Sequence, residues 1–247
     1  GWRLRLREGE ESTVDCRWLI DATGRGGALA RRLGAVRRRQ DRLVAFVARF
    51  RARAEAPSDR DARTWIEAEP GGWWYTARVP TEEPLIGERV VAFHTDADLA
   101  RGSGARTPEG FAAGLARAPR LHALLAAHGY RMLGRPRGVD AGSTRLDPAV
   151  GEGFLAVGDA ALSLDPLSSQ GLFHALYTGW QGGEAVHATL AGDASAPASY
   201  GRRLAEIHRA YVSHLAVYYA AEQRWPGRPF WARRRGERIL TGASGGV

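Results

Sequence analysis

The sequence predicts an α/β protein, α+β overall, in which two kinds of structure follow each other along the chain. A short apolar run at 154–157 leads through a polar turn into a long helical segment, which is the strand–turn–helix order of an α/β domain. Between residues 42 and 135, β-rich runs are separated by Pro, Gly and charged loops, which is typical of antiparallel strands. We therefore expect an α/β domain that is interrupted by an antiparallel sheet.

The composition is that of a globular protein in a reducing compartment. With 247 residues, 44% of them hydrophobic and 25% charged, the chain is long enough for one large domain or two small ones. No apolar run approaches the roughly 20 residues that a membrane span needs, so we expect no membrane partner. The single cysteine, Cys16, cannot form an internal disulfide, which favours a cytoplasmic location.

Every basic charge behind the net charge of +8 is an arginine, because the chain has no lysine. The arginines are spread along the chain, and the densest runs, at 37–39 and 233–235, lack a recognisable nucleic-acid-binding module around them. We therefore expect no nucleic acid as a partner. A positive field around an anionic ligand or an acidic partner protein is a simpler use of this charge, and a solvated surface is simpler still.

The amino-terminal elements are predicted to be short. Trp2–Arg7 and Val14–Ile20 alternate between polar and apolar residues on either side of a turn-like segment, so we expect a β-hairpin. The sequence Asp-Ala-Thr-Gly-Arg at 21–25 closes the second strand. Residues Ala28–Leu33 are predicted to form a short helix that Gly34 terminates.

The middle of the chain is predicted to contain strands followed by two helices. Thr107 is expected to cap a helix whose first turn contains Pro108. Pro119 interrupts that helix, and leucines at 121, 124 and 125 mark a second one that ends at Gly129. The preceding β-rich runs are Leu43–Phe50, Thr64–Glu67, Trp73–Val79 and Glu88–His94.

The carboxy-terminal third is predicted to be helical. Leu172, Leu176 and Trp180 recur at helical spacing, and a second amphipathic stripe continues until Pro226 ends it. The aromatic residues that follow could cover a neighbour or simply pack within the chain. The second stripe consists of Tyr200, Leu204, Ile207, Tyr211, Leu215 and Tyr218, and the later aromatics are Trp225, Phe230 and Trp231.

The turn and helix at Gly158–Leu172 carry the residue types of a nucleotide site. A carboxylate where a buried strand ends, Asp159, can accept a charge-assisted hydrogen bond from a ribose hydroxyl, with a strength of about 1.5–3 kcal/mol. Its alternative role is a helix N-cap. A helix that begins near Pro166 can direct unpaired backbone N–H groups at an electron-rich ring, and the alternative is an ordinary capped helix. Gly171 lets the backbone approach such a ring closely.

This fifteen-residue stretch resembles the second FAD motif, Gly-Asp-Ala…Asp-Pro…Gly, of FAD-dependent aromatic hydroxylases and flavin-dependent halogenases. The resemblance implies an FAD-binding domain of the para-hydroxybenzoate hydroxylase type with an inserted antiparallel-sheet substrate domain. It also implies FAD, reduced by NAD(P)H or by a partner flavin reductase. In that family the Asp-Ala-Thr-Gly-Arg element lies beside the dinucleotide, whereas the alternative is a plain turn. The cofactor-binding candidates are Gly158, Asp159, Ala160, Asp165, Pro166, Ser169, Gln170, Gly171, Leu172 and Gly24.

The resemblance also divides the chain. Residues 1–36 are expected to be part of the FAD-binding domain and 37–137 the substrate domain. Residues 138–196 return to the FAD-binding domain with its motif, and 197–247 form a helical segment. The Gly-x-Gly-x-x-Gly loop, which lies upstream in the family, occurs nowhere in the sequence. We therefore expect the amino-terminal dinucleotide-loop part to be absent.

Trp73, Trp74 and Tyr75 are the substrate-side candidates, and packing alone is the equal alternative. Flavin-dependent halogenases carry Trp-x-Trp-x-Ile-Pro near this place. Alignment on Pro80 puts Tyr75 and Ala77 where the two tryptophans stand, and no lysine exists here to match the halogenase lysine. An open aromatic face flanked by Arg78 and Arg89 would suit a tryptophan-bearing, acidic partner.

The variant Asp-Pro-Leu-Ser-Ser-Gln-Gly at 165–171 is most similar to flavoprotein maturases that oxygenate a tryptophan of a partner oxidase on the way to a cysteine–tryptophylquinone cofactor. The resemblance implies an FAD-dependent monooxygenase and an oxidase precursor as its partner. One alternative is a halogenase or hydroxylase of a small indole, pyrrole or phenol. Another is a non-catalytic remnant or subunit.

No catalytic residue and no metal ligand is assigned from the sequence. The seven histidines show no spacing typical of a metal site. His174 lies one turn past the motif and could face a flavin ring, but a histidine packed in a helix interface is the stronger expectation.

Overall fold

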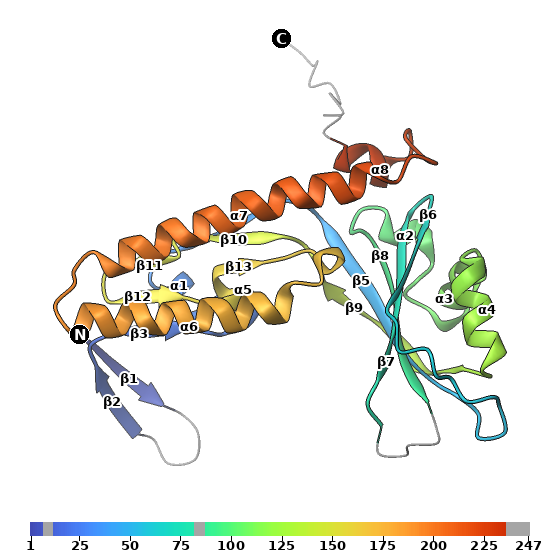
Figure 1. Cartoon of the computed structure of the whole chain (residues 1–247), viewed down its shortest axis with the longest axis horizontal. Coiled ribbons are helices and arrows are strands. Elements are labelled where there is room, and N and C mark those ends of the chain that lie inside the picture. Colours follow the sequence, from blue (N-terminus) through green and yellow to red (C-terminus); the bar gives the residue numbers. More distant parts are fainter. Residues whose placement is uncertain (7–11, 82–86, 236–247) are drawn as a thin grey trace, which may run out of the picture. The chain divides into compact units, whose positions relative to one another are not determined.

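The computed structural model describes residues 1–6, 12–81 and 87–235. It divides into two compact units (Figure 1). Unit 1 comprises residues 1–41 and 142–215, and unit 2 comprises 42–141 and 216–247. These boundaries lie four or five residues beyond the expected ones, and the expected separate segment 197–247 is shared between the two units because its long helix begins in one and ends in the other.

The first elements of unit 1 differ from the predicted hairpin. Strands β1 (Trp2–Leu6) and β2 (Ser12–Cys16) do pair antiparallel, but β2 ends at Cys16. A separate strand, β3 (Leu19–Asp21), pairs in parallel with β12 (Phe154–Ala156) in another sheet. The prediction of one strand over Val14–Ile20 was therefore wrong. The polar and apolar residues keep alternating between the end of β2 and the start of β3, so the sequence pattern did not show that two strands with different partners lie here.

Two small sheets form the frame of unit 1. Strand β11 (Val150–Gly151) joins β12 and β3 in one of them. The other contains β13 (Leu162–Ser163), β10 (Thr144–Asp147) and β4 (Val36–Arg39). The sequence did not predict β4, because its run of arginines is typical of a solvated surface.

Helices cover these sheets (Figure 1). The short helices are α1 (Ala28–Arg32), which confirms the predicted helix, and α5 (Gly158–Ala161). The long ones are α6 (Gly171–Leu190) and α7 (Ala196–Ala220). The Tyr200 hydroxyl of α7 donates to the carbonyl oxygen of Ala156 at 2.8 Å and so fixes α7 beside β12. The core of the unit lies beneath them and includes Leu19, Ala30, Leu146, Phe154, Leu155, Ala156, Ala160, Ala185 and Leu204.

Unit 2 is built on a five-stranded antiparallel sheet in the order β6-β7-β8-β5-β9. Four strands match the predicted runs. The fifth, β9, was not predicted because Gly134, Pro136 and three arginines interrupt its pattern. A register irregularity between Val47 and Arg49 opposite this segment accommodates the proline on an edge strand. The strands are β5 (Leu43–Arg51), β6 (Trp65–Glu69), β7 (Gly72–Val79), β8 (Glu88–Asp96) and β9 (Arg131–Asp140).

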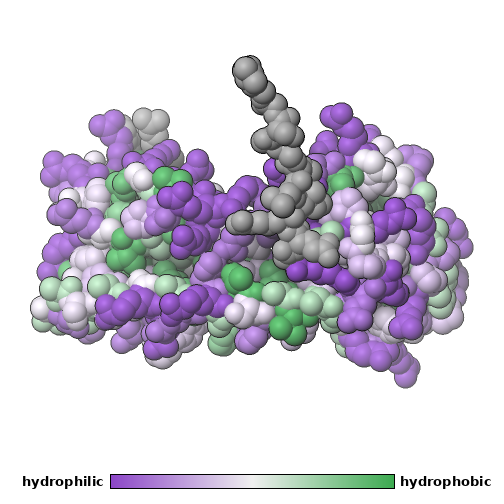
Figure 2. All heavy atoms as spheres, turned by 90° about the horizontal axis from the view of Figure 1, so that it is seen from above, coloured by the Kyte–Doolittle hydropathy of each residue, from purple (hydrophilic) through white to green (hydrophobic). Residues whose placement is uncertain are grey.

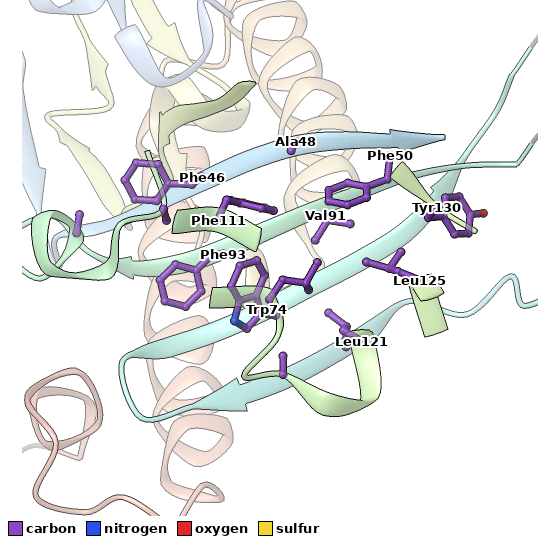
Figure 3. Packing of buried hydrophobic residues seen from close by; sticks show 14 residues of the cluster. Phe46, Ala48, Phe50, Trp74, Val91, Phe93, Phe111, Leu121, Leu125 and Tyr130 are labelled. Carbon is purple, nitrogen blue, oxygen red and sulfur yellow. The ribbon is translucent and has the colours of Figure 1, made fainter. Parts of the chain in front are cut away.

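Three helices cover one face of this sheet. They are α2 (Ala100–Ser103), α3 (Pro108–Leu115) and α4 (Pro119–Ala127). The predicted cap is confirmed, since Thr107 Oγ1 accepts from the Gly110 N–H at 3.1 Å. Figure 3 shows aromatic and aliphatic side chains of the strands and of α3 and α4 meeting in one cluster, among them Phe46, Phe50, Trp74, Val91, Phe93, Phe111, Leu121 and Leu125.

The carboxy-terminal aromatics pack within unit 2. Helix α8 (Pro229–Arg234) buries Phe230 and Trp231, and the Trp231 indole N–H donates to the carbonyl oxygen of Glu69 at 2.9 Å. Tyr218, which the predicted stripe included, is 65% exposed, and its neighbour Tyr219 is buried instead. The buried stripe of α7 therefore ends at Tyr219 and not at Tyr218, because the last turns of the helix pack on Phe230 and Trp231 of unit 2.

The outer surface is mostly polar on the face that Figure 2 presents. None of the helices in the described ranges has the length and apolar character needed to cross a membrane.

Candidate functional site

Two parallel strands of unit 1 end at the same edge of their sheet. Asp21, the last residue of β3, lies opposite Ala156, the last residue of β12. The loops that follow, at 22–27 and 157–161, therefore leave the sheet side by side. The carboxyl ends of parallel strands are where ligands bind in open α/β sheets.

Asp21 organises the first loop and is buried. Its carboxylate accepts from the backbone N–H of Thr23 at 2.9 Å, the Thr23 hydroxyl at 2.6 Å and the N–H of Ala30 at 2.8 Å. Burial by itself would raise the pKa of Asp21, but these hydrogen bonds outweigh it and hold the pKa below its usual value. The sequence placed Asp21 at the strand end but did not predict that it ties β3 to α1.

The second loop is shaped by Gly158 and Ala160, which are both buried. Gly158 has a φ of 55°, and a methyl group on its Cα would lie 3.3 Å from Cβ of Ala175 in α6. Its N–H donates to Thr178 Oγ1 at 2.8 Å. Gly158 thus permits a close approach between the loop and α6, and neither candidate residue presents a side chain at the surface.

Asp159 is the member of this loop whose side chain remains accessible. Its carboxylate is 34% exposed and lies 3.3 Å from Nε of Arg25. The N-cap of α5 is Val157, and no side-chain hydrogen bond caps that helix. The expected alternative, a capping role for Asp159, is therefore not observed.

Two arginines connect the loops. Arg25, besides its pair with Asp159, donates from Nη1 to the carbonyl oxygen of Gly142 at 2.7 Å and from Nη2 to that of Leu164 at 3.1 Å. Arg37 of β4 lies beneath the second loop and donates to the carbonyl oxygens of Ala160 at 2.8 Å and Asp159 at 3.2 Å.

Arg37 is a residue that supports the candidate site and that the sequence did not identify. It also donates to Thr144 Oγ1 at 2.6 Å, so it links β4, β10 and the loop around Asp159. Burial lowers the pKa of its guanidinium, although that group remains charged at neutral pH. In the sequence, Arg37 lies shortly before a predicted sheet, which could have marked it as part of a strand. Because it is the first of three consecutive arginines, nothing in the sequence distinguished it from the other two.

Asp165 and Pro166 start a 3-10 turn, η2 (Pro166–Ser168), and not the long helix. The predicted helix start near Pro166 is corrected to Gly171, because the Asp165 carboxylate accepts from the N–H of Leu167 at 2.9 Å and caps this turn. The Asp165 N–H donates to the hydroxyl of Tyr211 at 2.8 Å. Asp165 is 1% exposed, so it shapes the loop from within.

The candidates Ser169, Gln170, Gly171 and Leu172 form an exposed start to α6. Ser169 has a φ of 52°, the left-handed conformation, and it turns the chain from η2 into the long helix. The first N–H groups of a helix have no acceptor within it and lie at the positive end of its dipole. A methyl group on Cα of Gly171 or of Gly24 would meet no atom within 4 Å, so both positions leave the backbone accessible.

His174 lies in the second turn of α6 and is 4% exposed. Burial lowers its pKa, with Asp159 acting weakly in the opposite direction. Among the described residues its Nε2 has no hydrogen-bond partner. His174 is thus a packed, neutral histidine, in agreement with the stronger of the two expectations from the sequence.

The comparisons with known proteins agree with this geometry. A family model described as an FAD binding domain matches residues 3–203, which include both loops and α6. The chain belongs to this family of FAD-binding domains. FAD is accordingly its cofactor, and the resemblance to FAD-dependent aromatic hydroxylases and flavin-dependent halogenases is confirmed at the level of the family.

Similar proteins include LodB of Marinomonas mediterranea, a protein named as an FAD-dependent oxidoreductase. It is 30% identical over 246 residues, which are 98% of this chain and 63% of LodB. The flavin-dependent halogenase CmlS has a similar structure, with a TM-score of 0.77 and 26% identity over 93% of this chain and 42% of CmlS. The peptidyl tryptophan dihydroxylase QhpG, essential for tryptophylquinone cofactor biogenesis, has a TM-score of 0.71 and 22% identity over 97% of this chain and 54% of QhpG.

The candidate cofactor-binding residues of unit 1 fit that cofactor. Asp159 presents an accessible carboxylate, the acceptor that a ribose or ribityl hydroxyl requires. Gly24 and Gly171 leave the backbone open, and the start of α6 offers N–H groups to an electron-rich ring. Gly158, Ala160 and Asp165 support these groups from within the fold.

The aromatic residues expected on the substrate side lie in unit 2 and differ from the expectation. Trp73 and Trp74 are each 1% exposed. The Trp73 ring stacks on His94 with a centroid distance of 3.6 Å, and Trp74 belongs to the cluster under α3. The open Trp-Trp surface is therefore not observed, because adjacent strand residues point to opposite faces and both faces are covered there.

Tyr75 is the half-buried member of this group. The flanking arginines also differ from the expectation. Arg89 is completely buried in an ion pair with Asp59 at 2.6 Å, and Arg78 lies opposite Arg89 on the face that the helices cover. Neither arginine provides a surface for an acidic partner beside Tyr75.

Proposed function

We propose that the protein is an FAD-dependent monooxygenase that hydroxylates a peptidyl tryptophan of a partner oxidase during the maturation of a quinone cofactor. The observation that carries the proposal is the loop around Asp159, joined by Arg25 to the loop of β3 and followed by the exposed start of α6. The relation to LodB supports an FAD-dependent oxidoreductase. The sequence Asp-Pro-Leu-Ser-Ser-Gln-Gly at 165–171 and the likeness to QhpG favour a tryptophan substrate.

The residues have separate tasks in this proposal. Asp159 binds a ribose or ribityl hydroxyl, and Arg25 orients its carboxylate. The N–H groups at the start of α6 stabilise negative charge on the ring by about 0.3–1 kcal/mol each. Asp165 and Tyr211 hold the turn that leads into α6. When bound, FAD supplies the redox chemistry by which oxygen is activated.

We also propose that a further strand and helix, with the dinucleotide loop between them, complete unit 1 in the whole protein. Within the described part, β3 is the last strand of its sheet, so its outer edge accepts a neighbour. On α6, Leu172, Leu176 and Trp180 are 62–77% exposed and form an apolar stripe that a helix would cover. The chain spans 63% of LodB, which leaves room for such a segment.

The experiment uses the full-length protein. It should be yellow after purification, and with a flavin reductant, oxygen and the oxidase precursor it should add oxygen mass to one tryptophan of that precursor. Mass spectrometry of peptides locates the addition. A colourless protein that takes up no FAD would contradict the flavoprotein assignment.

A second candidate is a halogenase or hydroxylase of a small indole, pyrrole or phenol. The TM-score of 0.77 to CmlS favours it, while the missing tryptophans at 75 and 77 speak against halogenation. The same full-length preparation distinguishes the two. Turnover of a free indole or phenol, with halide where halogenation is tested, and an unchanged precursor would favour the small-molecule enzyme.

A further inference from the structure

The positive charge of the protein is concentrated in unit 2. That unit holds 21 of the 35 basic residues and 14 of the 27 acidic ones, a net charge of +7, whereas unit 1 has a net charge of +1. A general compositional bias towards arginine would affect both units alike. The location of these arginines within unit 2 therefore matters.

Helices α2–α4 cover one face of the five-stranded sheet. On the other face, which we call the uncovered face, the end that carries Trp73, His94 and Asp96 is buried, whereas the end that carries Arg49 and Arg51 is exposed. Phe46 and Phe50 of β5 point to the covered face (Figure 3), so the alternate residues of β5 point to the other. The strand pairing then brings one residue from each strand into rows across the uncovered face. In successive rows Arg131 lies opposite Arg51, Leu133 opposite Arg49, and Arg137 opposite Val47.

Four arginines thus gather where β5 and β9 run side by side on the uncovered face. The side chains of Arg49 and Arg51 are 62% and 46% exposed, and Arg131 and Arg137 of the edge strand are exposed as well. We call Arg49, Arg51, Arg131 and Arg137 the arginine face. Like charges held this close together repel each other unless an anion lies among them.

The carboxylates that share this face offset only part of its charge. Glu88 is 1% exposed and pairs with both Arg49 and Arg51, the latter at 2.6 Å. Asp96, at the other end of the same strand, is 2% exposed and pairs with Arg233 and Arg234 of α8. Glu88 therefore orients two of the arginines, while Arg131 and Arg137 make no ion pair within the part of the chain that the structure describes.

Apolar side chains lie beside the arginine face. Leu133 and Val139 on β9 are 41% and 46% exposed, and Ile66 on β6 is 44% exposed. Tyr75 lies in the row of Arg137, Val47 and Ala92, between the arginines and Ile66. A ligand for this surface must therefore combine negative charge with apolar or aromatic groups.

We propose that the arginine face and its apolar neighbours bind an acidic polypeptide segment that carries an aromatic side chain. Several carboxylates of one extended segment can pair with arginines spaced along two strands, and the aromatic group can cover Leu133, Val139 or Tyr75. This inference rests on the proposed function for the identity of the partner. It adds to that function the kind of segment, acidic with an aromatic side chain, by which the protein substrate would be bound.

The test measures binding of a fluorescently labelled synthetic peptide, rich in glutamate with one tryptophan, to the full-length protein. Matched peptides replace every glutamate by glutamine or the tryptophan by alanine. The protein variant is Arg131→Glu with Arg137→Glu, which leaves the pairs of Glu88 intact. The matched control is Arg101→Glu with Arg120→Glu, an equal charge change at exposed positions of α2 and α4.

We expect the glutamate peptide to bind and each replacement peptide to bind less tightly. The variant with Arg131→Glu and Arg137→Glu should lose about tenfold or more in affinity for the glutamate peptide, and the control variant should lose much less. Thermal unfolding of both variants checks that they are folded. Equal losses in the two variants, no binding of the glutamate peptide, or equally tight binding of an oligonucleotide would each overturn the proposal. A colourless full-length protein that still binds the peptide would contradict the proposed function alone. An enzyme that oxidises the tryptophan of its protein substrate equally well with and without Arg131→Glu and Arg137→Glu would contradict this inference alone.

Discussion

At the scale of single residues, the site depends on a contrast between one accessible carboxylate and several buried ones. Asp21 and Asp165 are each 1% exposed and satisfied by hydrogen bonds within the fold, whereas the Asp159 side chain is 34% exposed. A buried carboxylate that already accepts several hydrogen bonds has little capacity left for a ligand. Asp159 is therefore the carboxylate that we propose to contact FAD.

Replacement of Asp159 by alanine should weaken FAD binding without unfolding the full-length protein. The lost charge-assisted hydrogen bond corresponds to about 10- to 100-fold in affinity. Flavin fluorescence titration measures the change. Asp147→Ala is the matched control, since Asp147 is a similarly exposed aspartate that pairs with Arg38 at 2.9 Å. Equal affinity in wild type and Asp159→Ala would show that Asp159 does not contact FAD.

Replacement of Arg37 by methionine should destabilise the protein by about 1–3 kcal/mol, because it leaves buried acceptors around the second loop unsatisfied. Arg38→Met, at the next position of the same strand, removes a surface ion pair that is 58% exposed at the arginine and should cost much less. Urea unfolding of both variants measures the difference. Similar losses would mean that the contacts of Arg37 contribute little.

His94 should make stability depend on pH. Burial lowers its pKa to about 3, so the folded protein keeps this histidine neutral where the unfolded chain, with a pKa near 6.5, takes up a proton. The free energy of unfolding should therefore fall as the pH drops below about 6.5, by up to about 1.4 kcal/mol per pH unit until the folded pKa is reached. His94→Phe, which keeps an aromatic ring on Trp73, should reduce this slope between pH 6.5 and 5 in urea unfolding, and an unchanged slope would count against the role of His94.

At the scale of secondary-structure elements, strands with a strong period of two were predictable, whereas several short or irregular ones were not. The runs that became β5, β7 and β8 have buried apolar residues that specify a sheet. Three of the four residues of β4 are arginine, and β9 combines three arginines with Gly and Pro, so only their partners make them strands. Their positions matter most for function, since β4 supplies Arg37 and β9 supplies half of the arginine face.

The elements of the site show the same limit. The sequence identified the motif at 158–172 and its chemistry, because its residue types are specific. It did not distinguish the 3-10 turn that Asp165 caps from the start of the long helix, because an Asp-Pro pair suits both. It could not show that Arg25 spans the two loops, since that contact joins positions far apart in the chain. The adjacent Trp73 and Trp74 looked like one surface, but a strand directs them to opposite sides.

Helix α6 carries a prediction at this scale. If its apolar stripe is covered in the whole protein, Trp180→Arg should destabilise the full-length protein by about 2 kcal/mol or more, as burial of a charge in an apolar contact does. Val217→Arg on α7 replaces a residue that is 68% exposed, against 62% for Trp180, and should change stability little. Thermal unfolding of the two variants measures the contrast, and an unaffected Trp180→Arg would mean that the stripe stays open.

At the scale of the whole molecule, the two units divide cofactor binding and charge. Unit 1, with a net charge of +1, contains the loops of the proposed FAD site, and unit 2, with a net charge of +7, contains the arginine face. A field of one sign on the unit that receives a partner accelerates association and is screened by salt over about 8–10 Å at physiological ionic strength. Affinity for FAD should depend much less on that field, because in the proposed site it derives from hydrogen bonds within unit 1.

This division predicts different salt dependences for different substrates. With an acidic protein substrate, kcat/KM of the full-length enzyme should fall severalfold between low and moderate salt, because the long-range attraction governs the encounter. With an uncharged free indole, the same enzyme should show little change over that range, and bound flavin absorbance should stay constant. Arg131→Glu with Arg137→Glu should remove most of the salt dependence for the protein substrate. Parallel salt curves for the two substrates would show that salt acts on the FAD site or on the fold, and that the charge of unit 2 does not select the partner.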